Sequence, residues 1–500
     1  GSGSAGGSSD FSWLVDLGVH DACFVGAAAM SVRAGSGSAC SNWLEDQKSD
    51  DSSSSSESSG CSRWCNWGSL VAGISNFAIQ YNYACASIAT AVMLSHDDLT
   101  SHRLRPDYPE PNWAKEFLLS VVFIGSVVGM LIMGYLGDLL GLRPALIVTN
   151  SMIVLGALAS ALLSWGSDGE VWGVIMVGRF VLGMGVGGNY PLSAAKASHA
   201  VPMHEAIAKT GAAFFWQGPG GISPYLLGLL LMDLPKFGDA IDTSVQFRTL
   251  LGVGAIPALV VLLATSQEKD DTHPIERREG QLAVALQSPA HWRTLIGTAG
   301  TWFFFDVAYY GTVIFSPTIL SSVFGAQESL RDVATRAAAL CCLGMLGTAL
   351  GLLVFLPMIG AKALNTVGLA LASLLFGLFA VVYHLHPHQS SLLFSCLCLL
   401  IFTLQIGPNV ATFLLPVVAF PEEVRSTFHG LSAAAAKLGA MTGALLFPIV
   451  NERYGVPAVM AAQAVVCAVG ALLSHCAVRE VDIAGENEDS DDEPLFGFQH

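Results

Sequence analysis

The stretch Gly297–Ser316 reads GTAGTWFFFDVAYYGTVIFS and holds one carboxylate, Asp306, in an otherwise apolar run. An ionised side chain is costly in hydrocarbon, so such a residue usually faces the interior of a helix bundle and serves a substrate or ion pathway. If the run is a helix, Trp302, Asp306 and Tyr310 share one face, because they lie four residues apart. Asp306 is therefore either a pathway residue or a structural acid paired with a basic residue elsewhere.

The whole chain has the composition of a membrane protein. Of its 500 residues, 52% are hydrophobic and only 12% are charged, whereas a soluble domain has roughly 25% charged residues. Much of the formal net charge of −16 lies in the two terminal segments, so it says little about a substrate path. The lipid bilayer is an expected partner, and nucleic acid is not.

The eleven cysteines predict neither a disulfide framework nor a metal site, and no cofactor is expected. Cys61 and Cys65 precede the first apolar run without a histidine or a second cysteine pair nearby, which disfavours a zinc site. Reversible acylation of these cysteines near the membrane is the alternative. In apolar runs a thiol behaves as a small buried hydrophobe, and seven cysteines lie in such runs: Cys85, Cys341, Cys342, Cys396, Cys398, Cys467 and Cys476.

From Gly68 onward, twelve apolar runs follow one another, each long enough to cross about 30 Å of hydrocarbon. They predict an all-α integral membrane protein with twelve transmembrane helices in two pseudo-symmetric six-helix halves. The runs cover residues 68–94, 113–137, 143–166, 171–196, 209–232, 247–266, 294–322, 333–356, 362–384, 390–418, 427–450 and 455–478.

The longest polar interval between these runs divides them into six and six. An even number of spans puts both ends of the chain on one side of the membrane, but the loop charges do not orient it, because Lys and Arg occur in both sets of loops. No basic segment precedes an early apolar run, so no cleaved signal is expected. The segments are a disordered Gly/Ser-rich tail at 1–67, an N-terminal half at 68–266, a central cytoplasmic linker at 267–293, a C-terminal half at 294–478 and an acidic disordered tail at 479–500.

Two pairs of similar segments indicate that the halves are repeats. GGNYP (Gly187–Pro191) and IGPNVA (Ile406–Ala411) each combine small residues with an asparagine, and each predicts a helix break. The loops GDLLGLRP and LPMIGAK both contain a glycine, a small or apolar residue and a base in a row. Many transporters built from repeats place their site between the halves, near the membrane midplane. The sequence thus predicts an alternating-access transporter.

Two segments resemble signatures of the major facilitator superfamily. Gly134–Arg143, GYLGDLLGLR, is similar to its loop signature, and Arg179–Gly187, RFVLGMGVG, to its fourth-helix RxxxGxGxG pattern. Asp138 can cap a following helix start or pair with Arg143, and so lock the halves in one state. The glycines permit close helix approach, and Arg179 must find partners inside the membrane as a gating or structural residue.

Four patches in chain order are similar to the phosphate:proton symporter family of that superfamily: GGNYPLSA, GTAGTWFFFDVAYYG, GPNVATFLLP and FPEEVRSTFHGLSAAAAKLGA. The resemblance covers nearly all of residues 68–478. It implies a twelve-helix facilitator with cytoplasmic tails and inorganic phosphate as the substrate. We expect the protein to lie in the plasma membrane, with an endomembrane as the alternative. The resemblance leaves the oligomeric state open.

The family's binding residues map onto Tyr190, Gln217, Trp302, Asp306, Tyr310 and Asn409, with Lys437 close by. Their N–H and O–H donors suit a tetrahedral oxyanion, and Lys437 adds a compact positive charge. Asp306 can accept the O–H of a protonated phosphate, which sulfate lacks at neutral pH. In the alternative interpretation, Lys437 is only the counter-ion of Asp306, and the aromatic residues and Gln217 serve packing and helix contacts.

The chain departs from the family in its membrane carboxylates, and its residues at those positions are Ile79, Asn82, Asn189, Val418 and His199. Of these, only His199 titrates near neutrality, and it is alternatively an interfacial residue. Proton-coupled transport would therefore rest on Asp306 and His199. The missing acids favour facilitative or exchange transport, and the further alternatives are another small anion, such as an organic phosphate, or a receptor that does not transport. An enzyme is not expected, because no nucleophile, base and orienting group converge.

Overall fold

The computed structural model describes residues 67–94, 108–109, 111, 115–232, 241–268, 275–324 and 330–478. The segments 1–66 and 479–500, where disordered tails are expected, lie outside these residues, as do Cys61, Cys65 and part of the expected linker. All regular secondary structure in the described residues is helical.

Helices α3 to α10 form the first half of the described chain: α3 (Trp67–Leu94), α4 (Lys115–Leu140), α5 (Leu142–Leu162), α6 (Asp168–Ala197), α7 (Met203–Phe215), α8 (Gln217–Met232), α9 (Ile241–Val253) and α10 (Ala255–Ser266). The second half follows α11 (Ile275–Gln287) and contains α12 (Pro289–Phe324), α13 (Leu330–Leu350), η3 (Gly351–Phe355), α14 (Leu356–Leu385), α15 (Ser390–Ile406), α16 (Pro408–Ala419), η4 (Glu422–Val424), α17 (Arg425–Tyr454) and α18 (Val456–Ala477).

These helices account for the twelve expected spans. Nine helical stretches of the described residues are long and apolar enough to cross a membrane, and one of them, Leu330–Leu385, contains both the eighth and the ninth expected spans. The fifth span is divided into α7 and α8 at Trp216, and the seventh is α12, which carries the polar residues around Asp306.

Glycines let α4 and α6 touch backbone to backbone. A Cβ added to Gly187 would lie 2.2 Å from the carbonyl oxygen of Ser126, and one added to Gly183 would lie 2.5 Å from that of Val122. Helices in lipid associate through close van der Waals packing, because lipid tails are as apolar as the side chains. The close approach expected from the RxxxGxGxG pattern is thus confirmed.

The two halves repeat the same close contacts. A Cβ on Gly220 of α8 would lie 2.5 Å from the oxygen of Phe77 on α3, and a Cβ on Gly439 of α17 would lie 2.3 Å from the oxygen of Phe303 on α12. The two similar loops also match, because Gly141 and Gly360 both have positive φ, 99° and 74°. Glycine adopts this conformation without a steric cost, so the internal repeat extends to backbone conformation.

One of the two predicted helix breaks does not occur, so that prediction is wrong. The chain does break at Gly407, between α15 and α16, but α6 runs continuously through Gly187–Pro191. Asn189 forms lateral hydrogen bonds instead: its Nδ2 donates to Oδ1 of Asn150 at 3.1 Å, and its Oδ1 accepts from Asn150 and Thr149. Neighbouring helices can support a proline inside a membrane helix in this way.

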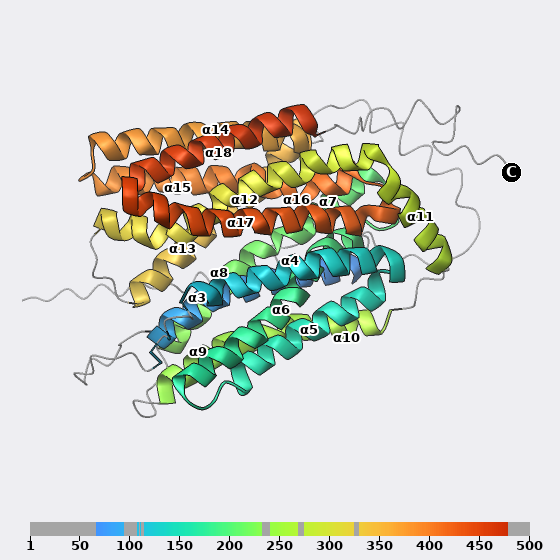
Figure 1. The fold of residues 1–500 in the computed structure, drawn as a ribbon, viewed down its shortest axis with the longest axis horizontal. Helices are drawn as coiled ribbons and strands as arrows, with labels where there is room; N and C mark the ends of the chain where they lie inside the picture. Colours follow the sequence, from blue (N-terminus) through green and yellow to red (C-terminus); the bar gives the residue numbers. More distant parts are fainter. Residues whose placement is uncertain are drawn as a thin grey trace, which may run out of the picture. The chain divides into compact units, whose positions relative to one another are not determined.

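In the described residues the halves meet chiefly along two pairs of helices, and α6 with α17 and α7 with α16 add further contacts. Helix α4 lies beside α17 (Figure 1), and α8 packs on α13. The first contact is again tight, because a Cβ on Gly430 would lie 2.3 Å from the oxygen of Met130. Aromatic residues also meet across the halves, since Phe123 of α4 packs on Tyr310 of α12.

We predict that Gly187→Ala destabilises the protein by about 1–3 kcal/mol, the usual cost of overpacking. The matched control is Gly173→Ala on the same helix, where an added Cβ would have nothing within 4 Å. Alanine is a better helix former than glycine, so the control should be neutral or slightly stabilising. Thermal unfolding in detergent micelles measures both, and equal melting temperatures would contradict the packing argument.

Candidate functional site

A buried charged cluster lies between α12 and α17. Nζ of Lys437 donates to Oδ2 of Asp306 at 3.0 Å and to the hydroxyl oxygen of Tyr310 at 3.0 Å. Both charged side chains are only 2% exposed. Since removing either partner would leave an uncompensated buried charge, the two residues depend on each other. Asp306 and Tyr310 lie one helical turn apart on α12, on the shared face expected from the sequence.

Aromatic rings from the other half cover this ammonium group. Nζ of Lys437 lies 5.6 Å from the ring centroid of Tyr83 on α3 and 5.3 Å from that of Tyr190 on α6. The ring of Tyr310 is 4.4 Å away, and Phe123 of α4 packs edge-on against it. The faces of such rings attract a cation when water is excluded. Aromatic rings of the N-terminal half thus cover the ammonium group of Lys437, which belongs to the C-terminal half.

Trp302 lies one turn before Asp306 and extends the aromatic wall. Its ring centroid is 6.4 Å from that of Tyr190, 6.3 Å from that of Phe413 on α16 and 5.6 Å from that of His429 on α17. Both Trp302 and His429 are buried, at 4% and 0% exposure. The imidazole Nε2 of His429 lies 3.1 Å from the carbonyl oxygen of Phe413, which fixes the ring against the wall.

Gln217 belongs to a side network rather than to the charged cluster. Its Nε2 donates to Oδ1 of Asn76 at 2.8 Å, and Asn76 donates through Nδ2 to Oγ of Ser193 at 3.2 Å. Ser193 in turn donates to the carbonyl oxygen of Tyr190. Gln217 is therefore connected to the aromatic wall through two intermediate side chains, Asn76 and Ser193.

Asn409 lies in a second side network, in the C-terminal half. Its Nδ2 donates to Oε1 of Gln405, and Nε2 of Gln405 donates to the hydroxyl of Tyr309 at 2.8 Å. The rings of Tyr309 and Tyr310 are in edge contact, with centroids 5.3 Å apart. Asn409 thus reaches the charged cluster through Gln405 and two neighbouring tyrosines.

Asp138 closes one end of the interface between the halves. Its carboxylate accepts hydrogen bonds from the backbone N–H groups of Ser426 at 3.1 Å and Thr427 at 2.6 Å, in the first turn of α17. A carboxylate at a helix N-terminus satisfies free donors and interacts favourably with the helix dipole. Arg143 donates to the carbonyl oxygens of Thr265 and Ser266 at the end of α10. Asp138 thus caps the distant helix α17 rather than the following helix α5, whose N-terminus has no side-chain cap.

Further polar contacts join the halves at the same end. Arg425 donates to Oγ of Ser198 at 3.0 Å and to its carbonyl oxygen at 3.3 Å. Nδ1 of His199 forms a hydrogen bond with the carboxylate of Glu422, and the His199 side chain is 52% exposed. His199 therefore lies at the closed end of the interface, apart from the charged cluster that contains Asp306.

Arg179 is fully buried in the N-terminal half, at 0% exposure. It donates to the carbonyl oxygen of Asn82 at 3.2 Å and to Sγ of Cys85 at 2.8 Å. Among the described residues, no carboxylate forms an ion pair with it. The partners that a membrane arginine requires are thus a backbone oxygen and a sulfur.

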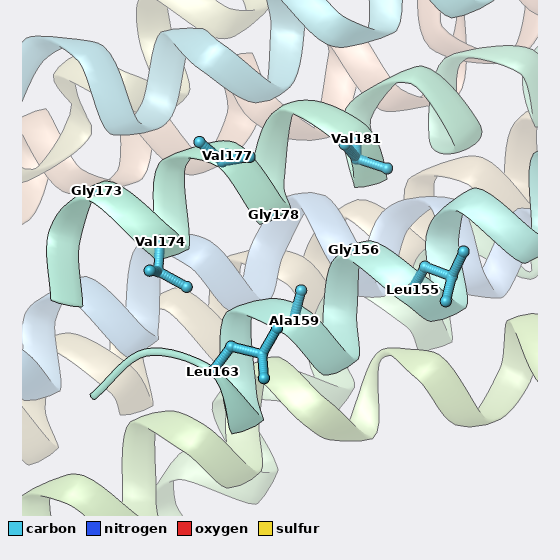
Figure 2. A pocket seen from close by; sticks show the side chains of 9 residues that line it. All are labelled: Leu155, Gly156, Ala159, Leu163, Gly173, Val174, Val177, Gly178 and Val181. Carbon is cyan, nitrogen blue, oxygen red and sulfur yellow. The ribbon is translucent and has the colours of Figure 1, made fainter. Parts of the chain in front are cut away.

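A separate hollow of about 410 Å³ lies between α5 and α6 (Figure 2). Apolar side chains such as Leu155, Leu163 and Val177 line it, together with three glycines, and these three side chains are more than 60% exposed. The lining offers no polar side chain to an ion, so this hollow is not the candidate site.

Five of the seven expected binding residues meet directly, namely Tyr190, Trp302, Asp306, Tyr310 and Lys437, while Gln217 and Asn409 lie in the side networks. Sequence reasoning missed Tyr83, Phe123 and Phe413, because an aromatic residue in a membrane span carries no signal of its own. Gln405 could have been found, since it precedes Asn409 by four residues and so shares its helix face.

Comparison with known proteins identifies the family. The model of the family "Sugar (and other) transporter" matches residues 68–266 and 266–483. The chain belongs to this transporter family. The expected membership of the major facilitator superfamily is thus confirmed, and so is the expectation of a transporter rather than an enzyme.

The curated relatives of this family member include several inorganic phosphate transporters. The chain is 32% identical to inorganic phosphate transporter PT2 of Toxoplasma gondii, over 81% of this chain and 70% of the relative. It is 27% identical to probable inorganic phosphate transporter 1-7 of Arabidopsis thaliana, over 76% of this chain and 81% of the relative. The resemblance to the phosphate transporter branch is thereby confirmed.

Solved structures confirm the twelve-helix facilitator fold. A crystal structure of a double tryptophan mutant of XylE matches with a TM-score of 0.68 at 14% identity, covering 83% of this chain and 95% of that one. The structure of the proton:xylose symporter XylE bound to 6-bromo-6-deoxy-D-glucose matches with a TM-score of 0.66 at 15% identity, covering 82% and 95%. The family member is therefore a multi-pass membrane protein.

We predict that Lys437→Met lowers stability by about 3–5 kcal/mol, because it leaves the carboxylate of Asp306 buried and unpaired. The double variant Asp306→Asn/Lys437→Met should recover part of that loss. Thermal unfolding of purified protein in detergent micelles measures the cycle. A double variant as unstable as the sum of the two single variants would contradict the mutual dependence of the pair.

Proposed function

We propose that this protein transports inorganic phosphate across a membrane by alternating access. The observation that carries the proposal is the buried cluster of Lys437, Asp306 and Tyr310, which one half builds and the other half covers with aromatic rings. A site made by both halves is reached from either side when the halves rock about it. The names of the phosphate transporters among the relatives support the substrate.

The chemistry of the cluster suits a protonated phosphate. Lys437 supplies the positive charge and Tyr310 a hydroxyl that both donates and accepts. Asp306 accepts the O–H that monohydrogen or dihydrogen phosphate offers and that sulfate lacks. A site that hydrogen-bonds a substrate O–H rejects an analogue without it, because its own buried group would stay unpaired. We therefore assign to Asp306 the selection of phosphate over sulfate.

Access would alternate through the polar contacts at the closed end. Asp138 caps α17, and Arg425 binds the end of α6 at Ser198. All these groups also find partners in water, so solvent offsets part of the free energy that is lost when these contacts separate. A ligand that binds one arrangement better shifts the population toward it. We assign the gating role to Asp138 and a supporting role to the pair of His199 and Glu422.

The coupling mode has two forms that this site can support. In proton-coupled transport Asp306 carries the proton, with His199 at the closed end as a second group. In facilitative or exchange transport Asp306 acts on selectivity alone. We place the protein in the plasma membrane with both ends of the chain in the cytoplasm, as the family resemblance implies.

Labelled phosphate flux in proteoliposomes tests the function. Uptake stimulated by an inward proton gradient supports the coupled form, and gradient-independent flux or counterflow supports the other form. Binding without flux would leave a receptor and overturn the proposal. Faster flux of an organic phosphate than of inorganic phosphate would overturn the assigned substrate.

We predict that Asp306→Asn reduces phosphate flux about 10- to 150-fold and removes the preference over sulfate, because a hydrogen bond to a charged group contributes about 1.5–3 kcal/mol. The matched control is Asp168→Asn in the exposed first turn of α6, which should transport like the parent. Competition of labelled phosphate uptake by unlabelled sulfate measures the preference. Full retention of flux and preference in Asp306→Asn would contradict the assigned role.

A further inference from the structure

Tyr83 of α3 lies beside the charged cluster, yet it is not among the residues that the family resemblance maps to the substrate. Its ring centroid is 5.6 Å from Nζ of Lys437 and 6.4 Å from the ring centroid of Tyr190, which the resemblance does map. Electrostatic interactions link its phenol to Lys437 and to the carboxylate of Asp306. The phenol of Tyr83 therefore belongs to the surroundings of the charge that would hold an anion.

The hydroxyl of Tyr83 begins a short chain of hydrogen bonds that ends on backbone oxygens. It donates to Oγ of Ser126 on α4 at 2.7 Å. The hydroxyl of Ser126 is buried, at 0% exposure, and donates to the carbonyl oxygens of Val122 at 2.7 Å and Gly183 at 3.2 Å. Ser126 therefore keeps its own hydrogen bonds whether or not Tyr83 donates to it.

Packing also holds the ring of Tyr83 in place. The ring is stacked on that of Phe123 of α4, with centroids 5.4 Å apart and an angle of 25° between the planes. Phe123 in turn packs edge-on against Tyr310, at 5.3 Å between centroids. Because these contacts involve the rings alone, they persist when the hydroxyl of Tyr83 changes its partner. The place of the ring and the hydrogen bond of the hydroxyl can therefore be tested separately.

The ammonium group of Lys437 retains hydrogen-bonding capacity for an anion. A lysine ammonium has three N–H donors, and Asp306 and Tyr310 accept from it at 3.0 Å each. No other hydrogen-bond acceptor for this group occurs among the described residues. The rings of Tyr83 and Tyr190 lie over Nζ. An anion that accepts from the remaining N–H therefore lies next to the tyrosines of the N-terminal half.

We propose that Tyr83 is a phosphate-binding residue of the N-terminal half, whose O–H turns from Oγ of Ser126 to an oxygen of the anion when phosphate binds Lys437. This inference rests on the proposed function and adds a binding residue to it. The exchange is favourable because a hydrogen bond to a charged oxygen is about twice as strong as one between neutral hydroxyls. No covalent bond changes, and Ser126 keeps its hydrogen bonds to the backbone.

The hydroxyl of Tyr83 joins the two halves through the substrate. Tyr83 contacts α4 through Phe123 and Ser126, so it moves with the N-terminal half, whereas Lys437 and Asp306 belong to the C-terminal half. An anion that accepts from both tyrosine and lysine binds best when the halves lie together over it. Since a ligand shifts the population toward the arrangement that it binds best, phosphate favours the arrangement in which both halves enclose it.

Phosphate uptake into proteoliposomes tests the inference with three variants. Tyr83→Phe keeps the ring and loses the O–H. We expect it to raise the KM for phosphate about 5-fold, because the two exchanged hydrogen bonds differ by about the strength of one neutral bond. Ser126→Ala removes the partner that Tyr83 has in the empty site, so its KM should equal that of the parent or be lower. The control Tyr81→Phe on the same helix removes a hydroxyl that donates to the carbonyl oxygen of Leu250, and its KM should match the parent.

The comparison of Tyr83→Phe with Ser126→Ala separates binding from packing, because both variants break the same hydrogen bond between α3 and α4. If that bond served only to hold the two helices together, the two variants would raise the KM equally. An equal rise would overturn the inference, and so would a parental KM in Tyr83→Phe.

Equilibrium binding of labelled phosphate to the purified protein in detergent micelles makes the test independent of transport. We expect Tyr83→Phe to bind about 5-fold more weakly than the parent and Ser126→Ala to bind at least as tightly. Equal binding by the parent and Tyr83→Phe would overturn the inference alone. A parent that binds phosphate without transporting it would overturn the proposed function, while weaker binding by Tyr83→Phe would still support the role of Tyr83. A parent that neither binds nor transports phosphate would overturn both.

Discussion

A lysine ammonium and an aspartate carboxylate, 3.0 Å apart and each 2% exposed, set the main constraint on this structure. Neither charge is tolerated in the bundle without the other, because desolvation makes a lone buried ion costly. The surroundings of the pair follow from this requirement. Tyr310 binds the ammonium, and rings from α3, α4 and α6 keep water from it while still attracting the positive charge. Under the proposed function an anion would share Lys437 with Asp306, which would link binding and charge balance at one place.

The two halves surround their buried bases differently. In the C-terminal half Lys437 meets a carboxylate, whereas in the N-terminal half Arg179 meets a backbone oxygen and the sulfur of Cys85. The helices that carry Lys437 and Asp306 touch through Gly439 and Gly443, so this pair has little freedom to separate. Close packing of this kind is the main source of helix association in lipid, and here it also fixes the distances on which the electrostatics depend.

Several features were predictable because they depend on local pattern. The apolar runs predicted the spans, and the glycine spacing of α6 predicted its close packing on α4. The four-residue spacing predicted that Trp302, Asp306 and Tyr310 share one face. Other features were not. Gly187–Pro191 looked like a break, yet lateral hydrogen bonds of Asn189 and packing on α4 keep α6 helical. Cys85 looked like an ordinary buried hydrophobe, since no spacing rule connects it to Arg179, 94 residues away.

The sequence by itself determined the membrane class, the twelve helices and the family, since length, hydropathy and short patterns survive without knowledge of contacts. It also named the polar residues from which a site could be built. Only the tertiary structure decided which of them meet: Lys437 with Asp306, Gln217 and Asn409 in side networks, and His199 at the closed end of the interface. The physical reason is that a charge inside a membrane takes its role from whichever partner the packing of distant helices places within hydrogen-bond distance.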